Sequence, residues 1–282
     1  MKNKSSKIGR FGMVHIPKTA GTSLSRVIHE SLDLVPVHIS RIITKKNNHT
    51  QKKTGGILKS SIAFKIACNS PYISGHIMFH ELRKMRRQFI FTVMRDPRKR
   101  LISLFTYQCK RVKYGRVDPF HPDLGKSPDI GFYDYMRICR PNNGMNLLLR
   151  DMKGYQQIFK NYDGSNQERI GLDVTNLIEA GLKRYDVIYS CSIQEVLDDL
   201  ASREVIPKSE AAWINESDGE VNFGGMGSRV KFLDTINAAV WLDMLIYDAA
   251  KRLFPETMKI PIASDDEIIE YVESRYNLKF PS

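Results

Sequence analysis

The chain has 282 residues, of which 42% are hydrophobic, and a formal net charge of +12. This length suits one large core, and no Pro/Gly/Ser-rich linker divides it, so we expect a single domain over residues 1–282. The charge indicates an anionic partner, such as nucleic acid, a nucleotide, an acidic glycan or a membrane surface. No apolar run approaches the roughly 20 residues of a membrane span, and His15 and Pro17 interrupt the N-terminal apolar stretch, so we expect neither a transmembrane segment nor a signal peptide.

The cysteines indicate the redox compartment. Four are present, at Cys68, Cys109, Cys139 and Cys191, and none forms a CxxC pair. This spacing predicts buried, reduced thiols of a cytoplasmic protein rather than a disulfide framework or a zinc site.

Residues 11–25, FGMVHIPKTAGTSLS, predict a strand, a tight loop and a helix. The apolar run ends at Pro17, and Leu24, Val27 and Ile28 then recur at helical spacing. Such a turn directs backbone N–H groups and the positive end of the helix dipole at one point. The loop predicts a phosphate or sulfate site formed by Lys18, Thr19, Ala20, Gly21, Thr22 and Ser23.

This loop has two other interpretations. It could be an ordinary helix start that Thr and Ser side chains cap. It is not a Walker A loop, because Lys18 precedes Gly21, whereas that motif places its lysine after the second glycine. The Gly-Lys-Ser at residues 125–127 has Phe120 where the first glycine is required.

The next predicted elements are a second strand at residues 34–39 and a third at 71–75 that ends at His76. Between them, residues 41–60 contain six Lys/Arg and no acid. We interpret this segment as a solvated basic loop or insertion rather than a specific binding element.

Residues 88–95, QFIFTVMR, form the clearest strand of the sequence. The nearly continuous apolar run is typical of a parallel strand that is covered on both faces. Asp96 and Pro97 then form a favoured N-cap and N1 pair, which predicts that a helix begins here.

The remaining sequence alternates further helices with one strand. We expect helices at residues 131–140, 146–152, 173–183, 193–202 and 235–253, a strand at 185–189 and irregular structure at 205–229. Strands that alternate with helices predict an α/β fold with a central, mainly parallel sheet flanked by helices. Ligands bind beyond the carboxyl ends of such strands, so we expect Lys18, His76 and Arg95 at one crevice.

Three motifs resemble a known family. HIPKTAGTSL at residues 15–24 resembles the 5′-phosphosulfate loop of sulfotransferases that use 3′-phosphoadenosine 5′-phosphosulfate (PAPS). RDPRKRLISLF at residues 95–105 resembles their 3′-phosphate motif, in which an Arg is followed eight residues later by a Ser. SGH at residues 74–76 resembles the Gly-His segment of the carbohydrate branch, which includes the heparan sulfate and dermatan 2-O-sulfotransferases.

Weaker similarity extends along the chain, at residues 185–197, 214–217 and 239–254. The Golgi members carry a membrane anchor and lumenal disulfides, which this sequence does not show. The chain is therefore similar to a soluble, bacterial-type member of the family.

The resemblance implies a P-loop-like three-layer fold and transfer of the sulfuryl group of PAPS to an acceptor hydroxyl of a carbohydrate or glycoconjugate. Lys18 and the loop donors would neutralise charge on the leaving phosphate, and no metal would be needed. Arg95 and Ser103 would hold the 3′-phosphate, and His76 would be the general base.

Alternatives remain for the histidines and for Arg100. His76 could be structural, His80 is the second-choice base, and His15 is a core or supporting residue. Arg100 is interpreted either as a nucleotide contact or as a surface charge.

Two other functions are open to the chain. A P-loop-type nucleotide or small-molecule kinase is disfavoured by the position of Lys18 and the lack of a clear Walker B carboxylate. A non-catalytic nucleic-acid-binding protein is disfavoured because no recognition-helix motif or array of stacking aromatics is present, so we expect no nucleic-acid partner. The acceptor is open among an anionic glycan, a lipid-linked sugar, a small metabolite and a peptide tyrosine.

Overall fold

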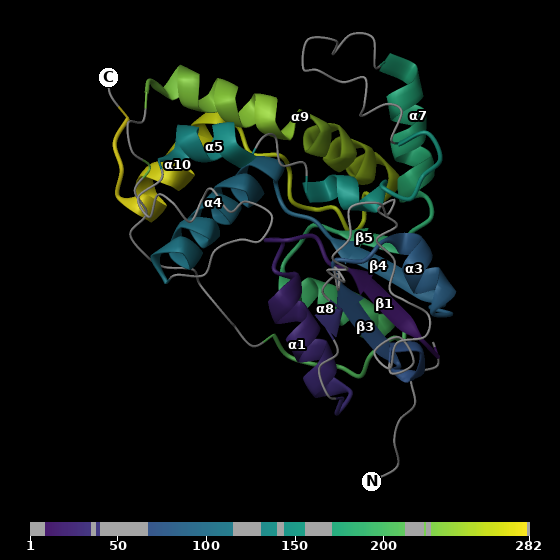
Figure 1. Cartoon of the computed structure of the whole chain (residues 1–282). Helices are drawn as coiled ribbons and strands as arrows, with labels where there is room; N and C mark the ends of the chain where they lie inside the picture. The colour runs from purple at the N-terminus through teal and green to yellow at the C-terminus, as the bar shows by residue number, and fades with distance from the viewer. Residues whose placement is uncertain are drawn as a thin grey trace, which may run out of the picture. The chain divides into compact units, whose positions relative to one another are not determined.

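The computed structural model of the chain describes residues 9–34, 38–39, 67–114, 131–139, 144–155, 171–211, 223 and 227–280 (Figure 1). The predicted basic loop at 41–60 and the weak similarity at 214–217 lie outside these residues. The chain divides into two compact units. Unit 1 comprises Met1–Met94, Leu147–Trp213 and Ala249–Lys259, and unit 2 comprises Arg95–Asn146, Ile214–Asp248 and Ile260–Ser282. The expectation of a single functional domain stays a prediction.

Unit 1 contains a five-stranded parallel sheet in the order β2-β3-β1-β4-β5. Its strands are β1 (Phe11–Val14), β2 (His38–Ile39), β3 (Tyr72–Gly75), β4 (Phe89–Val93) and β5 (Val187–Tyr189). The α/β class and the parallel sheet are therefore confirmed. Figure 1 shows β1 between β3 and β4, so the strand that precedes the predicted anion loop is central in the sheet.

Helices cover both faces of this sheet. On one face, Phe11, Met13 and Phe91 pack with apolar residues of α1 (Gly21–Ser31) and α8 (Ile193–Ser202). On the other face, a Cβ at Gly12 would lie 2.8 Å from Leu82 of α3 (Phe79–Lys84), so this glycine permits the close approach of α3 to β1. Unit 1 also contains α7 (Gly171–Leu182).

Unit 2 is helical and has an aromatic core. It contains α4 (Pro97–Lys113), α5 (Phe132–Cys139) and α10 (Asp265–Tyr276), together with most of α9 (Arg229–Leu253) and the start of the 3₁₀ helix η2 (Gly144–Leu148). The ring of Phe105 packs edge-to-face on Phe132 and Phe223, with centroids 5.3 and 5.1 Å away. These contacts join α4, α5 and Phe223 through a preferred aromatic geometry.

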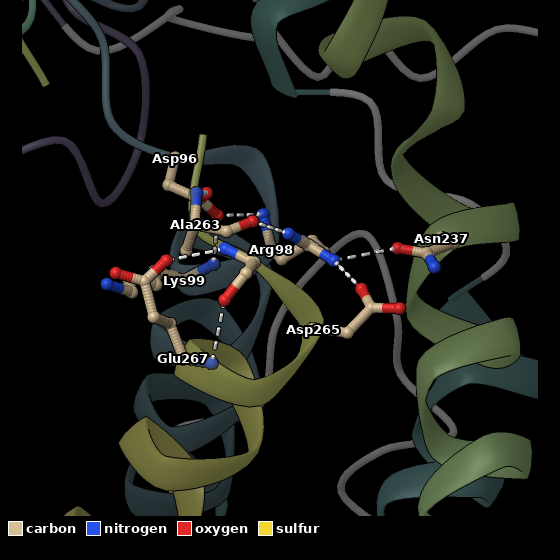
Figure 2. Close-up of polar contacts among 8 residues, drawn as sticks. Asp96, Arg98, Lys99, Asn237, Ala263, Asp265 and Glu267 are labelled. Carbon is tan, nitrogen blue, oxygen red and sulfur yellow. Dashed lines mark hydrogen bonds and ion pairs between the residues drawn. The ribbon is translucent and has the colours of Figure 1, made fainter. Parts of the chain in front are cut away.

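Asp96 fixes the start of α4, as the sequence predicted (Figure 2). One of its carboxylate oxygens accepts hydrogen bonds from the N–H groups of Arg98 and Lys99 at 2.8 and 2.9 Å. The other oxygen accepts a hydrogen bond at 2.8 Å from the N–H of Ala263, a residue just before α10. This carboxylate therefore caps one helix and also binds the segment that leads into another.

Arg98 extends this connection to α9. Its guanidinium donates to Asp265 at 2.5 Å, to Asn237 at 3.4 Å and to the carbonyl of Ala263 (Figure 2). The buried side chain thus joins α4, α9 and α10 with three acceptors, which a planar guanidinium can serve at once.

A second buried arginine corrects an expectation. Arg100 is neither a surface charge nor available to a nucleotide, because its side chain and that of Asp243 are both 0% exposed and form an ion pair at 3.0 Å. Burial raises the pKa of Asp243 to about 6, although Arg100 and the N–H of Met145 act in the opposite direction, so the carboxylate is still charged at neutral pH. A Cβ at Gly144 would lie 2.4 Å from the guanidinium, so this position requires glycine.

Several elements differ from the sequence prediction. The short helix α3 and the C-terminal helix α10 were not predicted, and α9 begins at Arg229 rather than Thr235. The helix expected at residues 146–152 is instead η2 followed by turns. Tertiary packing decides such short segments more than their local propensity does.

Two further sequence expectations concern cysteines and membranes. Cys68, Cys109 and Cys191 are free thiols, as expected, but they are half-buried rather than buried. Over the part of the chain that the structure describes, no helix has the length and apolarity that crossing a membrane demands.

We expect Asp243→Ala to lower the free energy of unfolding by about 3–5 kcal/mol, because it leaves the buried Arg100 guanidinium without its counter-ion. Urea denaturation followed by circular dichroism measures this change. Asp234→Ala is the matched control, since Asp234 is an exposed residue of the same helix. Equal stability of the two variants would contradict a structural role for the buried pair.

Candidate functional site

The loop after β1 has an unusual backbone. Lys18 and Ala20 adopt left-handed conformations, with φ of 68° and 63°, on either side of the buried Thr19. Left-handed non-glycine residues are uncommon and cost on the order of 1 kcal/mol each. Two of them within three residues turn the chain sharply from the strand into α1, and strain of this kind is frequent in ligand-binding loops.

The start of α1 does not fit the interpretation of an ordinary capped helix. Its N-cap is Ala20, and no side chain in the described part of the chain caps it. The hydroxyl of Thr19 instead donates to the carbonyl of Ile16 at 2.9 Å, so its one donor is used inside the loop. The first N–H groups of an uncapped helix are suited to an anion.

The six predicted loop residues differ in exposure. Ala20 and Thr22 are exposed, Lys18 is half-buried, and Thr19, Gly21 and Ser23 are buried. A ligand on this loop would therefore meet the backbone, Lys18 and Thr22 before it met the other hydroxyls.

Two histidines lie at the same edge of the sheet as this loop. The N–H of His15 donates to the carbonyl of Gly75 at 2.8 Å, which continues the pairing of β1 and β3. The rings of His15 and His76 stack with centroids 4.7 Å apart. The Nδ1 of His76 lies 2.6 Å from the carbonyl of His15, so Nδ1 carries the proton and the lone pair of the neutral ring is at Nε2.

Gly21 permits the close contact between His15 and α1. A Cβ at this position would lie 2.3 Å from Cδ2 and 2.7 Å from Nε2 of the His15 ring. The buried imidazole of His15 therefore packs between the start of α1 and His76, as expected for a supporting residue.

His80, the second-choice base, belongs to an ion-pair network. Its N–H and Nδ1 lie 2.8 and 3.1 Å from one oxygen of Asp151, whose other oxygen accepts from Arg184 at 2.7 Å. Burial alone would raise the pKa of Asp151. The hydrogen bonds and positive charges of Arg184 and His80 outweigh this effect, so the pKa is lowered overall. The ionised carboxylate holds His80 in a structural role at the start of α3.

Arg95 and Ser103 belong to unit 2. Arg95 immediately precedes the cap residue Asp96, is half-buried, and donates from Nη2 to the hydroxyl of Tyr271 at 3.2 Å. Ser103 is a buried residue of α4, two turns further on. Tyr271 was not anticipated from the sequence, because no local pattern indicates a partner 176 residues away.

Comparison of the chain with protein-family models, with curated proteins and with solved structures found no match. Among the described residues, no group of three or more His, Cys, Asp or Glu side chains could hold a metal ion.

We expect Gly21→Ala to lower the free energy of unfolding by about 1–3 kcal/mol, because the added methyl group overlaps the His15 ring. Ala20→Gly is the matched control, because it removes a methyl group from a neighbouring position whose φ is positive. It should change the free energy of unfolding by less than about 1 kcal/mol. Thermal and urea denaturation measure both. A Gly21→Ala protein as stable as the parent would show that the His15 contact is not needed.

Proposed function

We propose that the chain is a PAPS-dependent sulfotransferase that transfers the sulfuryl group to a hydroxyl of a carbohydrate or glycoconjugate. The observation that carries this proposal is the position of His76 beside the loop of Lys18. β1 and β3 are paired in parallel, with Val14 opposite Gly75, so the loop and His76 follow neighbouring strands at the same edge.

The sheet order is consistent with this proposal. A parallel sheet with β1 central, an anion loop directly after β1 and helices on both faces is the arrangement expected of a P-loop-like fold. The glycine and hydroxyl residues of the loop, its left-handed backbone and its uncapped helix suit the phosphosulfate end of the nucleotide.

The chemistry follows from the residues of unit 1. PAPS, when bound, supplies the sulfuryl group and leaves as adenosine 3′,5′-bisphosphate. The Nε2 of His76 accepts the proton of the acceptor hydroxyl while that oxygen forms its bond to sulfur. Lys18 and the first N–H groups of α1 stabilise the negative charge that develops on the phosphate oxygen as the bond from sulfur to this oxygen breaks.

Unit 2 contains the two residues of the proposed 3′-phosphate motif. Arg95 presents a planar guanidinium that suits a phosphate dianion, and Ser103 lies two turns along α4. The proposal needs no metal, because cationic and backbone donors provide the positive charge. The net charge of +12 favours an anionic acceptor.

Ligand-dependent thermal stability tests this assignment against the two alternatives. A sulfotransferase should be stabilised by adenosine 3′,5′-bisphosphate without metal, whereas a kinase should respond to ATP with Mg²⁺. A nucleic-acid-binding protein should respond to oligonucleotides, and chiefly at low salt. Mass spectrometry of candidate glycans incubated with PAPS then identifies the acceptor.

We expect Lys18→Ala to reduce turnover by roughly 10²–10³-fold while it weakens binding of adenosine 3′,5′-bisphosphate only a few-fold, because its charge acts mainly in the transition state. Steady-state kinetics and titration calorimetry separate these effects. Lys84→Ala, an exposed lysine of α3 in the same unit, is the control and should resemble the parent. Equal losses in binding and turnover would make Lys18 a binding residue alone.

We expect His76→Ala to lose about 10²–10⁴-fold in rate, the usual contribution of a general base, and still to bind adenosine 3′,5′-bisphosphate. His80→Ala is the control, because its imidazole is held by Asp151. Near-parental turnover of His76→Ala would reject His76 as the base.

A further inference from the structure

Three positively charged side chains lie near the ring of Tyr271 in α10. The guanidinium carbon of Arg95, the Nζ of Lys99 and the guanidinium carbon of Arg275 lie 5.9, 5.6 and 5.8 Å from its centroid. Each distance is within the range of a cation–π interaction. We call Arg95, Lys99, Tyr271 and Arg275 the Tyr271 cluster, and all four belong to unit 2.

These three cations differ from three other arginines of unit 2. Arg98, Arg100 and Arg229 each form an ion pair with a carboxylate. Within the described residues, no carboxylate pairs with Arg95, Lys99 or Arg275. The cluster therefore brings three positive charges to one ring without a paired carboxylate, which suits an anionic ligand.

Glu267 interacts electrostatically with Lys99 but is already engaged in the cap of α10. Glu267 accepts from the N–H of Ser264 at 2.6 Å in the capping box of α10. This hydrogen bond and that of the Ser264 hydroxyl are the main causes that lower the pKa of Glu267, and Lys99 is a minor one. Glu267 therefore serves the helix start and does not neutralise the cluster.

Helical spacing brings the cluster together from two helices. Lys99 and Ser103 are four residues apart on α4, and Tyr271 and Arg275 are four residues apart on α10, so each pair shares one side of its helix. Arg95 lies just before Asp96, the N-cap of α4. Asp96 and Arg98 hold the starts of α4 and α10 together (Figure 2), which keeps these two sides near each other.

We propose that Lys99 and Arg275 bind the 3′-phosphate of the nucleotide together with Arg95 and Ser103, and that Tyr271 positions the Arg95 guanidinium. The inference depends on the proposed sulfotransferase function and adds α10 to the nucleotide site. A phosphate dianion suits several cations and a hydroxyl, and the phenol oxygen of Tyr271 fixes one of these cations. The cluster would thus select nucleotides that carry a 3′-phosphate.

Titration calorimetry with two ligands tests this proposal. Adenosine 3′,5′-bisphosphate contains the phosphate in question, and adenosine 5′-phosphate lacks it. Lys99→Gln and Arg275→Gln should each weaken binding of the bisphosphate about tenfold or more and change binding of the monophosphate less than about twofold. Tyr271→Phe keeps the ring but loses the hydroxyl, and should weaken binding of the bisphosphate several-fold.

Matched controls remove a charge elsewhere on the same elements. The controls are Lys113→Gln and Lys279→Gln. Lys113 lies in the last turn of α4, Lys279 lies just beyond α10, and both side chains are exposed. Neither control should change the affinity for either ligand by more than about twofold. The melting temperature of ligand-free Lys99→Gln and Arg275→Gln should change little, because each variant loses only one cation–π contact outside the core. A merely structural role predicts a clearly lower melting temperature.

The outcomes separate this inference from the proposed function. If the parent prefers the bisphosphate to the monophosphate and the three cluster variants keep this preference undiminished, the inference is wrong and the sulfotransferase proposal stands. Equal losses for both ligands would also overturn it, because the cluster would not recognise the 3′-phosphate. If the parent binds no bisphosphate, the proposed function is overturned and this inference with it.

Discussion

The parallel pairing of β1 on both of its edges is the constraint on which the rest of unit 1 depends. Val14, its last residue, lies opposite Gly75 of β3 and Thr92 of β4, and the Thr92 hydroxyl donates to the Val14 carbonyl at 2.7 Å. Buried backbone groups must be paired, so the end of β1 is fixed on both sides. The chain can then turn sharply through Lys18 and Ala20 without losing the position of the loop. Strain in a loop is tolerated where the surrounding structure is this well determined.

Much of this arrangement could be predicted from the sequence because its signals are local. Apolar runs identified the strands, and the contiguous loop at residues 18–23 gave the candidate anion site. Asp96 and Pro97 marked the start of α4. The same reasoning applied to Ser264 and Glu267 would have found α10, since a capping box precedes its apolar Ile268 and Ile269.

The interactions between distant residues could not be predicted. Arg100 is paired with Asp243 across 143 residues, and a charged side chain in a sequence gives no sign of being buried with its counter-ion. The order of the strands was also open, because parallel strands are joined by long connections that do not fix their neighbours. The contact of the His15 ring with Gly21 depends on the shape of the turn, so a sequence that shows only a histidine and a glycine six residues apart does not reveal it.

The two-sided role of Asp96 has a consequence for biosynthesis. Its first oxygen can cap α4 as soon as that helix leaves the ribosome, but its second oxygen waits for Ala263, which is synthesised 167 residues later. The buried Arg98 guanidinium likewise depends on Ala263 and Asp265. During translation the aromatic core of unit 2 thus stays incomplete until α10 emerges, and such late closure exposes apolar surface to chaperones and to aggregation. A nascent chain stalled before α10 would hold a finished cap on α4 and an open core.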